Sequence, residues 1–508
     1  MSALRGAGGG GPGAVARRAA ALIVAAALAG CGVGPRYRPA PVVPAATEVG
    51  VPRLADSTRA FFDSLAAARA ADTARPASAP VPPRRLTADS VADLAWLDVL
   101  RDTVLTRLVG IALQQNRDVA TARATIEEYR ALAGVARSAL WPSLALNGSV
   151  SRNRVVFGTQ AIPPYTAWRA TADLSWELNF WAVGSGIAAA NADLAAQRAA
   201  ERAAVLSLVS DVATGYLQLL ELDQEHAVAE RTLASRQATL ELARQRFGRG
   251  LISELDVRQF EAQVAVPAAR LAQVEQARSR QEHALDVLLG EGPAPIPRGT
   301  TLAAAVRAVV VPDSIPSTLL ARRPDVEAAE RGYASATARV GIADAARLPS
   351  FVITGSYGGQ APTAGNVFQG QARVYEFLGG ISIPLFTGGR LVNEAAAARA
   401  QAEQARAQYE QAVLVALGEA GDALVGVRAA RDAAAAEQTQ ATALRRALAL
   451  AEMRYRSGVS NYLEVLDAER SLFDAELAAS QAQLQQLTAA VQLYKALGGS
   501  WPGMDATR

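Results

Sequence analysis

The sequence contains very little cysteine, histidine or aromatic side chain. Of its 508 residues one is cysteine, Cys31, and two are histidines. A single cysteine excludes an internal disulfide framework and a cysteine-rich metal site. His226 and His283 have no ligand spacing with another metal-binding group, so we expect no metal site. Aromatic residues make up 6% of the chain, and its many small side chains favour closely packed helices over one thick core.

An excess of one charge is also missing from most of the chain. The formal net charge is +3, but residues 1–30 hold three arginines and no acid, which leaves the remainder neutral. Nucleic-acid binding depends on neutralising phosphates, so we expect no nucleic-acid partner. The sequence has no phosphate-binding loop, no Gly-x-Ser-x-Gly motif and no zinc motif. We therefore predict a protein that is not an enzyme and has no catalytic residue.

The first thirty residues have the plan of a secretory signal. Arg17 and Arg18 precede an apolar run of signal-peptide length that is too short to span a bilayer. The run ends Leu28-Ala29-Gly30-Cys31, and small residues before a cysteine resemble the lipobox of bacterial lipoproteins. That resemblance implies cleavage before Cys31 and a covalent N-acyl and S-diacylglycerol lipid on it, with no other cofactor. An ordinary signal peptide with a chance cysteine is the alternative.

The remainder divides into a tether, two similar halves and a tail. Residues 31–95 are Pro-rich and then low in complexity, which is typical of a tether, and 500–508 form the tail. Residues 96–300 and 301–499 carry the same landmarks in the same order and at nearly constant spacing. For example, Arg246-Phe247-Gly248-Arg249-Gly250 is echoed by Arg454-Tyr455-Arg456-Ser457-Gly458. This pattern indicates an internal duplication.

Each half contains two strands with one apolar and one polar face, at about 143–153 and 167–180, then at about 350–359 and 374–385. Such strands suit a membrane barrel, although a soluble sandwich fits the strand pattern equally well. Four strands cannot close a barrel, and an open sheet edge cannot face hydrocarbon. The chain must therefore oligomerise if these strands enter the membrane, and hydrogen bonding alone leaves dimer and trimer open.

Long helices favour the membrane interpretation. We expect them at about 185–247 and 253–289 in the first half and at about 391–456 and 460–497 in the second. Apolar residues recur along them at heptad spacing, as in coiled coils. A compact domain has no need of helices this long, whereas a tube or a coiled-coil spacer does.

Three motifs together resemble the TolC-like outer-membrane efflux family, in particular its OprM-like (NodT-type) lipoproteins. They lie at Cys31 to Pro39, at Arg322 to Glu330 and at Tyr455 to Ala468. The resemblance implies a mainly α fold with membrane β: a trimer sharing a twelve-stranded β-barrel, four strands per subunit, continued by a long α-helical coiled-coil barrel. The sequence departs from the family at Asn179 to Gly184, the junction between strand and helix.

The resemblance also implies a function. It predicts a passive exit duct for small molecules in the cell outer membrane, lipid-anchored and with a long periplasmic part. Its partners would be a periplasmic adaptor (membrane fusion protein) and an inner-membrane pump of the resistance-nodulation-division (RND) type. The alternatives are the outer-membrane duct of a type I protein secretion system and a periplasmic adaptor itself. The sequence does not indicate the exported substrates.

The same resemblance places the adaptor contact at the two helical turns. The matching residues are Gly250, Ser253, Leu255, Gly458 and Ser460. We expect Gly250 and Gly458 to adopt a positive backbone dihedral, and Ser253 and Ser460 to cap the helices that follow.

The family's acidic pore constriction matches Glu464 and Asp467, which lie one helical turn apart on one face. A threefold axis would crowd six carboxylates together, favour cations and raise some pKa values. Asp256 and Tyr455 match a closing contact between neighbouring coils, and Ser460 stands where relatives can supply an arginine. The alternative is that these acids are solvated surface residues.

Overall fold

The structure is a computed structural model. It describes residues 34–35, 37, 48–49, 102–154, 156–157, 160–161, 163–306, 315–316, 322–457, 459–460 and 462–499. The predicted signal peptide, Cys31, most of the tether, Gly458 and the C-terminal tail lie outside the described residues.

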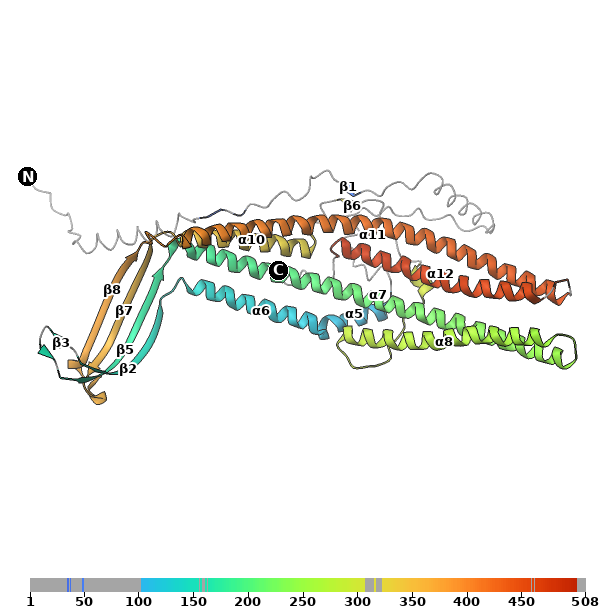
Figure 1. The fold of residues 1–508 in the computed structure, drawn as a ribbon, viewed down its shortest axis with the longest axis horizontal. Helices are drawn as coiled ribbons and strands as arrows, with labels where there is room; N and C mark the ends of the chain where they lie inside the picture. The colour runs from blue at the N-terminus through green and yellow to red at the C-terminus, as the bar shows by residue number, and fades with distance from the viewer. Residues whose placement is uncertain are drawn as a thin grey trace, which may run out of the picture. The chain divides into compact units, whose positions relative to one another are not determined.

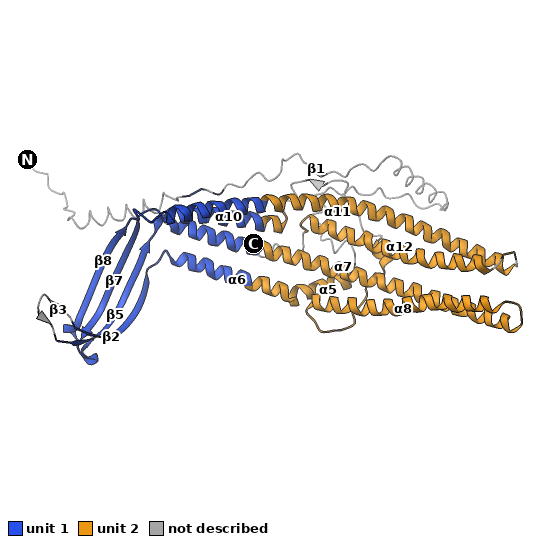
Figure 2. Ribbon diagram, viewed as in Figure 1, with its two compact units in different colours: residues 1–40, 125–198, 328–409 blue, residues 41–124, 199–327, 410–508 orange. Residues whose placement is uncertain are grey.

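The chain forms two compact units, coloured separately in Figure 2. Unit 1 contains residues 1–40, 125–198 and 328–409, and unit 2 contains residues 41–124, 199–327 and 410–508. The long helices α7 (Phe180–Gly248) and α11 (Arg390–Arg456) contribute residues to both units. By length and composition α7 could cross a membrane, but 56% of its most apolar stretch is buried, as in a core helix.

Unit 1 contains a four-stranded antiparallel sheet (Figure 1). Its order is β2 (Ser143–Asn153), β5 (Tyr165–Leu178), β7 (Ser350–Ala361) and β8 (Arg373–Ser382). Strands β2 and β8 are the two edges. A small hairpin, β3 (Val156–Phe157) with β4 (Gln160–Ala161), lies between β2 and β5 in the chain, and the short helices η2 (Ala364–Asn366) and η3 (Gly370–Ala372) lie between β7 and β8.

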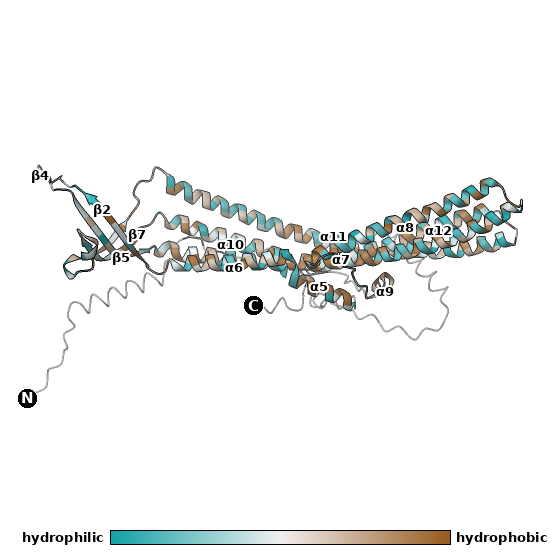
Figure 3. Cartoon of the chain, turned by 90° about the horizontal axis from the view of Figure 1, so that it is seen from below, coloured by the Kyte–Doolittle hydropathy of each residue, from teal (hydrophilic) through white to brown (hydrophobic). Residues whose placement is uncertain are grey.

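The two faces of this sheet differ as the alternation predicts. Figure 3 shows that hydrophilic and hydrophobic residues both occur along its strands. One face exposes large apolar side chains, among them Leu144, Leu146, Val150, Tyr375, Phe377 and Ile381. On the other face Asp173 accepts hydrogen bonds from Asn147 at 2.6 Å and from Thr171 at 3.2 Å. Cross-strand pairs of this kind hold the register.

Several element boundaries differ from the predicted ones. Helix α7 begins at Phe180 rather than at about 185, because the Asn179 side chain accepts the amide hydrogen of Ala182 at 3.2 Å and caps the helix. Strand β8 ends at Ser382 rather than at about 385. Pro384 lies two residues after Ser382 and has no N–H to donate to a ladder. Strand β5 begins at Tyr165, two residues earlier than predicted.

The helices of unit 1 pack through small apolar clusters and one docked segment. Ile126 on α6 (Arg117–Ser138) packs with Leu194 on α7. Near the N-terminus, the Tyr37 hydroxyl donates to Glu330 on α10 (Pro324–Ala345) at 2.8 Å. Gly34 lies so close to Gly341 that an added Cβ would stand 2.5 Å from the Gly341 Cα. Gly34 and Tyr37 therefore lie against α10.

Unit 2 is built around two helical hairpins. The first hairpin is α7 with α8 (Glu254–Leu289), and the second is α11 with α12 (Tyr462–Ala496). Helices α5 (Thr103–Gln115) and α9 (Leu302–Val306) and the strand pair β1 (Glu48–Val49) with β6 (Ile315–Pro316) complete this unit. Its core contains fully buried residues from α5, α7, α8 and α12, including Leu105, Val212, Tyr216, Leu285 and Leu487.

A buried polar centre fixes the start of α5 in this core. Asp102 accepts the amide hydrogens of Val104 and Leu105 at 2.8 and 3.1 Å and so caps the helix. The same carboxylate accepts the Tyr216 hydroxyl of α7 at 2.8 Å, and the amide of Gly299 donates to that hydroxyl at 2.8 Å.

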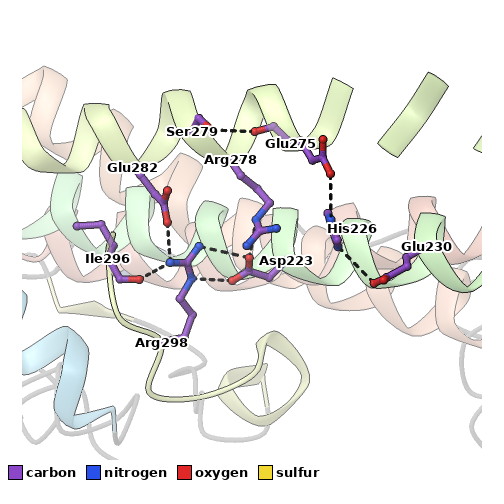
Figure 4. Close-up of polar contacts among 9 residues, drawn as sticks. All are labelled: Asp223, His226, Glu230, Glu275, Arg278, Ser279, Glu282, Ile296 and Arg298. Atoms are coloured by element: carbon purple, nitrogen blue, oxygen red, sulfur yellow. Dashed lines mark hydrogen bonds and ion pairs between the residues drawn. The ribbon is translucent and has the colours of Figure 1, made fainter. Parts of the chain in front are cut away.

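A charged network ties the segment after α8 to the first hairpin (Figure 4). Arg298 binds Asp223 on α7 at 2.8 Å and Glu282 on α8 at 2.7 Å. Nearby, His226 stands between Glu230 and Glu275, 3.7 and 3.8 Å away. The spacing of residues in the sequence did not indicate the contact with Glu275. Within the part of the chain that the structure describes, no group of three or more histidine, cysteine, aspartate or glutamate side chains could hold a metal ion.

Candidate functional site

The turn of the first hairpin is stabilised by its own residues. Gly250 has a φ of +72°, which confirms its predicted left-handed conformation. The Ser253 side chain accepts the amide of Asp256 at 3.3 Å, while the Ser253 amide and hydroxyl donate to the Asp256 carboxylate at 2.9 and 2.7 Å. This reciprocal capping box confirms Ser253 as the predicted cap. The hydrogen bonds from Ser253 hold the pKa of Asp256 below its ordinary value.

The turn of the second hairpin closes through the same backbone hydrogen bond as the first. The Val459 amide donates to the Arg454 carbonyl, as the Leu251 amide donates to the Arg246 carbonyl, each at 3.0 Å. The two turns differ in how the following helix is capped. The Ser460 hydroxyl is buried and, among the described residues, has no hydrogen-bond partner. Because α12 begins two residues later, at Tyr462, the prediction that Ser460 caps it is wrong.

Both turns expose apolar side chains. Leu251 and Leu255 in the first turn are each about two-thirds exposed, and Val459 and Leu463 in the second are similarly open to solvent. Exposed apolar residues that cluster at the end of an element mark a contact surface. Leu255, one of the predicted adaptor-contact residues, belongs to this set, and Ser253 lies in the same turn.

The two predicted gate acids each lie beside an arginine. Glu464 is 3.5 Å from Arg454, and Asp467 is 2.8 Å from Arg470. All four side chains are at least half exposed. A surface pair contributes little to stability. Each arginine nevertheless balances the charge of its acid locally, so the acidic face is less negative than the two acids alone predict.

Asp256 and Tyr455 line the same cavity of about 360 Å³ but have different partners. Asp256 is engaged by Ser253, whereas the Tyr455 hydroxyl accepts a hydrogen bond from Arg246. Sequence reasoning did not select Arg246 as a site residue. A signal was available, since Arg246-Phe247 stands at the same point of the first half as Arg454-Tyr455 does in the second.

Further up the hairpins, the structure buries charges that sequence reasoning missed. Arg236 is 3% exposed, donates to the Gln263 carbonyl at 2.8 Å and lies 5.6 Å from the centre of the Phe473 ring. Burial lowers its pKa. Glu225 binds Arg270 at 2.6 Å, and burial next to Glu225 raises the pKa of Glu221 to about 7. A single sequence offers no signal for such pairs.

The chain combines long helical hairpins with a small antiparallel sheet whose apolar face is exposed. This combination is typical of outer-membrane channel proteins. The family model described as outer membrane efflux protein matches residues 108–291 and 315–499. The chain belongs to this family.

Similar proteins agree with this assignment. The pyoverdine export outer membrane protein OpmQ of Pseudomonas putida is 32% identical over 84% of this chain and 92% of its own length. The toluene efflux pump outer membrane protein TtgC of the same species is 33% identical, covering 81% and 86%.

Among solved structures, the outer-membrane channel OprN superposes with a TM-score of 0.75 at 27% identity, covering 93% of this chain and 100% of that one. The open state of the Neisseria gonorrhoeae MtrE outer membrane channel gives 0.76 at 29% identity, covering 92% and 98%. The protein is therefore an outer-membrane efflux component whose helical part is periplasmic.

Proposed function

We propose that three copies of this chain form one exit duct, with a shared twelve-stranded barrel above a helical coiled-coil tube. The observation that carries the proposal is the sheet of unit 1. It has four strands, its apolar face is exposed, and among the described residues β2 and β8 each have one neighbour. Unpaired edges cannot face hydrocarbon, and the smallest known membrane barrels have eight strands. Twelve strands from three copies satisfy both conditions.

The internal duplication belongs to the same proposal. It is supported by the two separate matches of the family model, 108–291 and 315–499, and by the equal division of the strands between the halves. The polar face, with Asp173 and its partners, would then line the water-filled interior.

The duct serves a tripartite efflux system, in which a periplasmic adaptor and an inner-membrane RND pump deliver small molecules to it. The exposed apolar turns at Leu251 and Val459 support an adaptor contact at the hairpin ends. Relatives named for pyoverdine export and toluene efflux support small molecules as cargo. The protein acts as a passive conduit with no catalytic step or cofactor. Acyl groups on Cys31 anchor it, in keeping with the lipobox before that residue.

Extraction of the full-length protein from outer membranes tests this proposal. We expect a trimer that needs detergent, dissociates on heating and forms pores in planar bilayers. A monomer that stays soluble without detergent after removal of its lipid would contradict it. Deleting the gene and measuring accumulation of dyes, solvents and antibiotics identifies the exported compounds.

The gate assignment has a separate test. Replacing Glu464 and Asp467 by alanine is expected to raise the pore conductance and weaken block by divalent cations, because the acidic ring is lost. Removing Arg454 and Arg470 is expected to strengthen that block, since the acids lose the positive charges 3.5 and 2.8 Å away. If neither pair of substitutions changes conductance or block, the constriction lies elsewhere.

A further inference from the structure

We propose that Arg246 is the positioning residue that latches the two helical hairpins together at their ends, by holding Tyr455. The inference rests on the proposed function, because it assumes that the hairpin ends surround a pore. It assigns the closing contact to an arginine of α7, whereas the family resemblance assigned it to Asp256 of α8.

The first step is the contact itself. Arg246 lies in the last turn of α7, and Tyr455 lies in the last turn of α11. The Arg246 guanidinium donates a hydrogen bond to the Tyr455 hydroxyl. Its central carbon also lies 5.5 Å from the centre of the Tyr455 ring, within the range of a cation–π interaction. One side chain of the first hairpin therefore holds both the hydroxyl and the ring of a residue in the second.

The second step is what Tyr455 supports. Its ring meets the Tyr462 ring edge to face, with centroids 5.1 Å apart, and Tyr462 in turn lies 4.3 Å from Phe260 of α8. Phe260 is buried, and burial raises the pKa of Tyr462. Arg246 thus secures one end of a stack of three rings that runs from the second hairpin back to the first. Aromatic pairs at these distances are favourable beyond their buried area.

The third step explains why the carboxylate does not make this contact. Asp256 accepts both the amide and the hydroxyl hydrogens of Ser253, at 2.9 and 2.7 Å. Turning Asp256 toward Tyr455 would break the carboxylate half of the capping box and leave only the cap from the Ser253 hydroxyl.

The neighbouring residue Arg244 provides a matched control. It lies two positions earlier on α7 and pairs with Glu261 on α8 at 3.0 Å, so its contact stays inside the first hairpin. Removing Arg244 takes the same charge from the same turn of helix without touching the link between hairpins. The conservative variant R246K retains a cation that can donate to the Tyr455 hydroxyl.

The test is the conductance of full-length acylated trimers in planar bilayers. R246Q is expected to raise the conductance several-fold and R244Q to leave it at the wild-type value, with R246K in between. Y455F removes only the hydroxyl and should give a smaller rise. In the double variant, Y455F should add no further rise to that of R246Q, because both substitutions remove the same contact between Arg246 and Tyr455.

The outcomes separate the two proposals. A wild-type protein that forms no pore contradicts the proposed function. A wild-type pore whose conductance is unchanged by both R246Q and Y455F overturns the latch, as do fully additive effects of the two substitutions. If R246Q does not assemble, Y455F still decides, since it leaves every charge in place. If D256N raises the conductance and Y455F does not, the closing contact is made by Asp256 rather than by Arg246 and Tyr455, and the proposal is wrong.

Discussion

Leu146 on strand β2 and Leu219 on helix α7 are both leucines of regular elements, yet the first is 85% exposed and the second is fully buried. The core residues of unit 2 turn inward and are covered by the chain itself, although other apolar residues of its helices, such as Leu414, are exposed. In the sheet of unit 1 the apolar side chains turn outward. The difference is expected if water surrounds the helices and membrane hydrocarbon surrounds the apolar face of the sheet. Hydrocarbon accepts apolar side chains as readily as a protein core does.

Buried charge distinguishes the two regions in a second way. The hairpins of unit 2 bury Arg236, Glu221 and Glu225 between helices, at a desolvation cost that only partners can offset. In the sheet, the polar face keeps its charged groups open to water. In the proposed trimer the sheet would depend on its surroundings and on neighbouring copies, whereas the hairpins depend on pairing within the chain. The predictions below test this contrast, from the largest expected effect to the smallest.

The sharpest test uses two adjacent residues of β2. Leu146→Arg places a charge on the apolar face, which costs about 2–4 kcal/mol per chain at the middle of a bilayer, and a trimer carries three copies. Asn147→Arg places the same charge beside Asp173 on the polar face, where it finds a carboxylate. We expect the first variant to lose the heat-modifiable trimer from outer membranes and the second to keep it. The reverse result would mean that the faces are exchanged.

The pair of the buried Glu225 with the partly exposed Arg270 should give the next largest effect. Arg270→Ala leaves Glu225, which is 6% exposed, without the arginine that lies 2.6 Å away. Breaking a buried pair in this way costs about 3 kcal/mol. The measurement is the midpoint of thermal or denaturant unfolding. Arg258 on the same helix pairs with Glu254 at the surface, so Arg258→Ala should change the midpoint far less. Equal effects would show that burial is not the cause.

Glu221 gives a prediction about pH. Burial, and then the charge of Glu225, raises its pKa from 4.5 to about 7. The folded protein therefore holds a proton that the unfolded chain releases above about pH 4.5. Its contribution to stability is present at lower pH and is lost as the pH rises through about 7, by at most about 3 kcal/mol. Glu221→Gln should remove this slope and be more stable than the wild type at pH 8. An unchanged slope would contradict the assignment.

Local signals in the sequence predicted the elements and their faces. The alternation of residues 167–180 gave a strand and the heptad spacing gave hairpins, because each pattern reports which side of its own element is apolar. The start of α7 was missed because its signal is one capping side chain, Asn179, rather than a period. Gly250 and Ser253 could be predicted because a turn is settled by residues close in sequence.

The site residues that sequence reasoning missed have distant partners. Arg246 meets Tyr455 and Arg236 meets Phe473, more than two hundred positions away in each case. From the sequence alone, an arginine on a long helix is expected to point into solvent. Only the packing of the hairpins shows what its side chain contacts. The prediction that Ser460 caps a helix was wrong for a different reason. The sequence did not show that α12 begins at Tyr462.

The two turns supply the smallest and most local comparison. Ser253→Ala removes the cap of α8 and should destabilise the protein by about 1 kcal/mol, which a shift of the unfolding midpoint would report. Ser460→Ala removes a buried hydroxyl that has no partner among the described residues, so it should leave stability unchanged or raise it slightly. A loss at Ser460 as large as that at Ser253 would mean that the second turn is capped after all. A loss at Ser253 alone would show that two turns closed by the same backbone hydrogen bond differ in their caps, because only the first takes its cap from the serine.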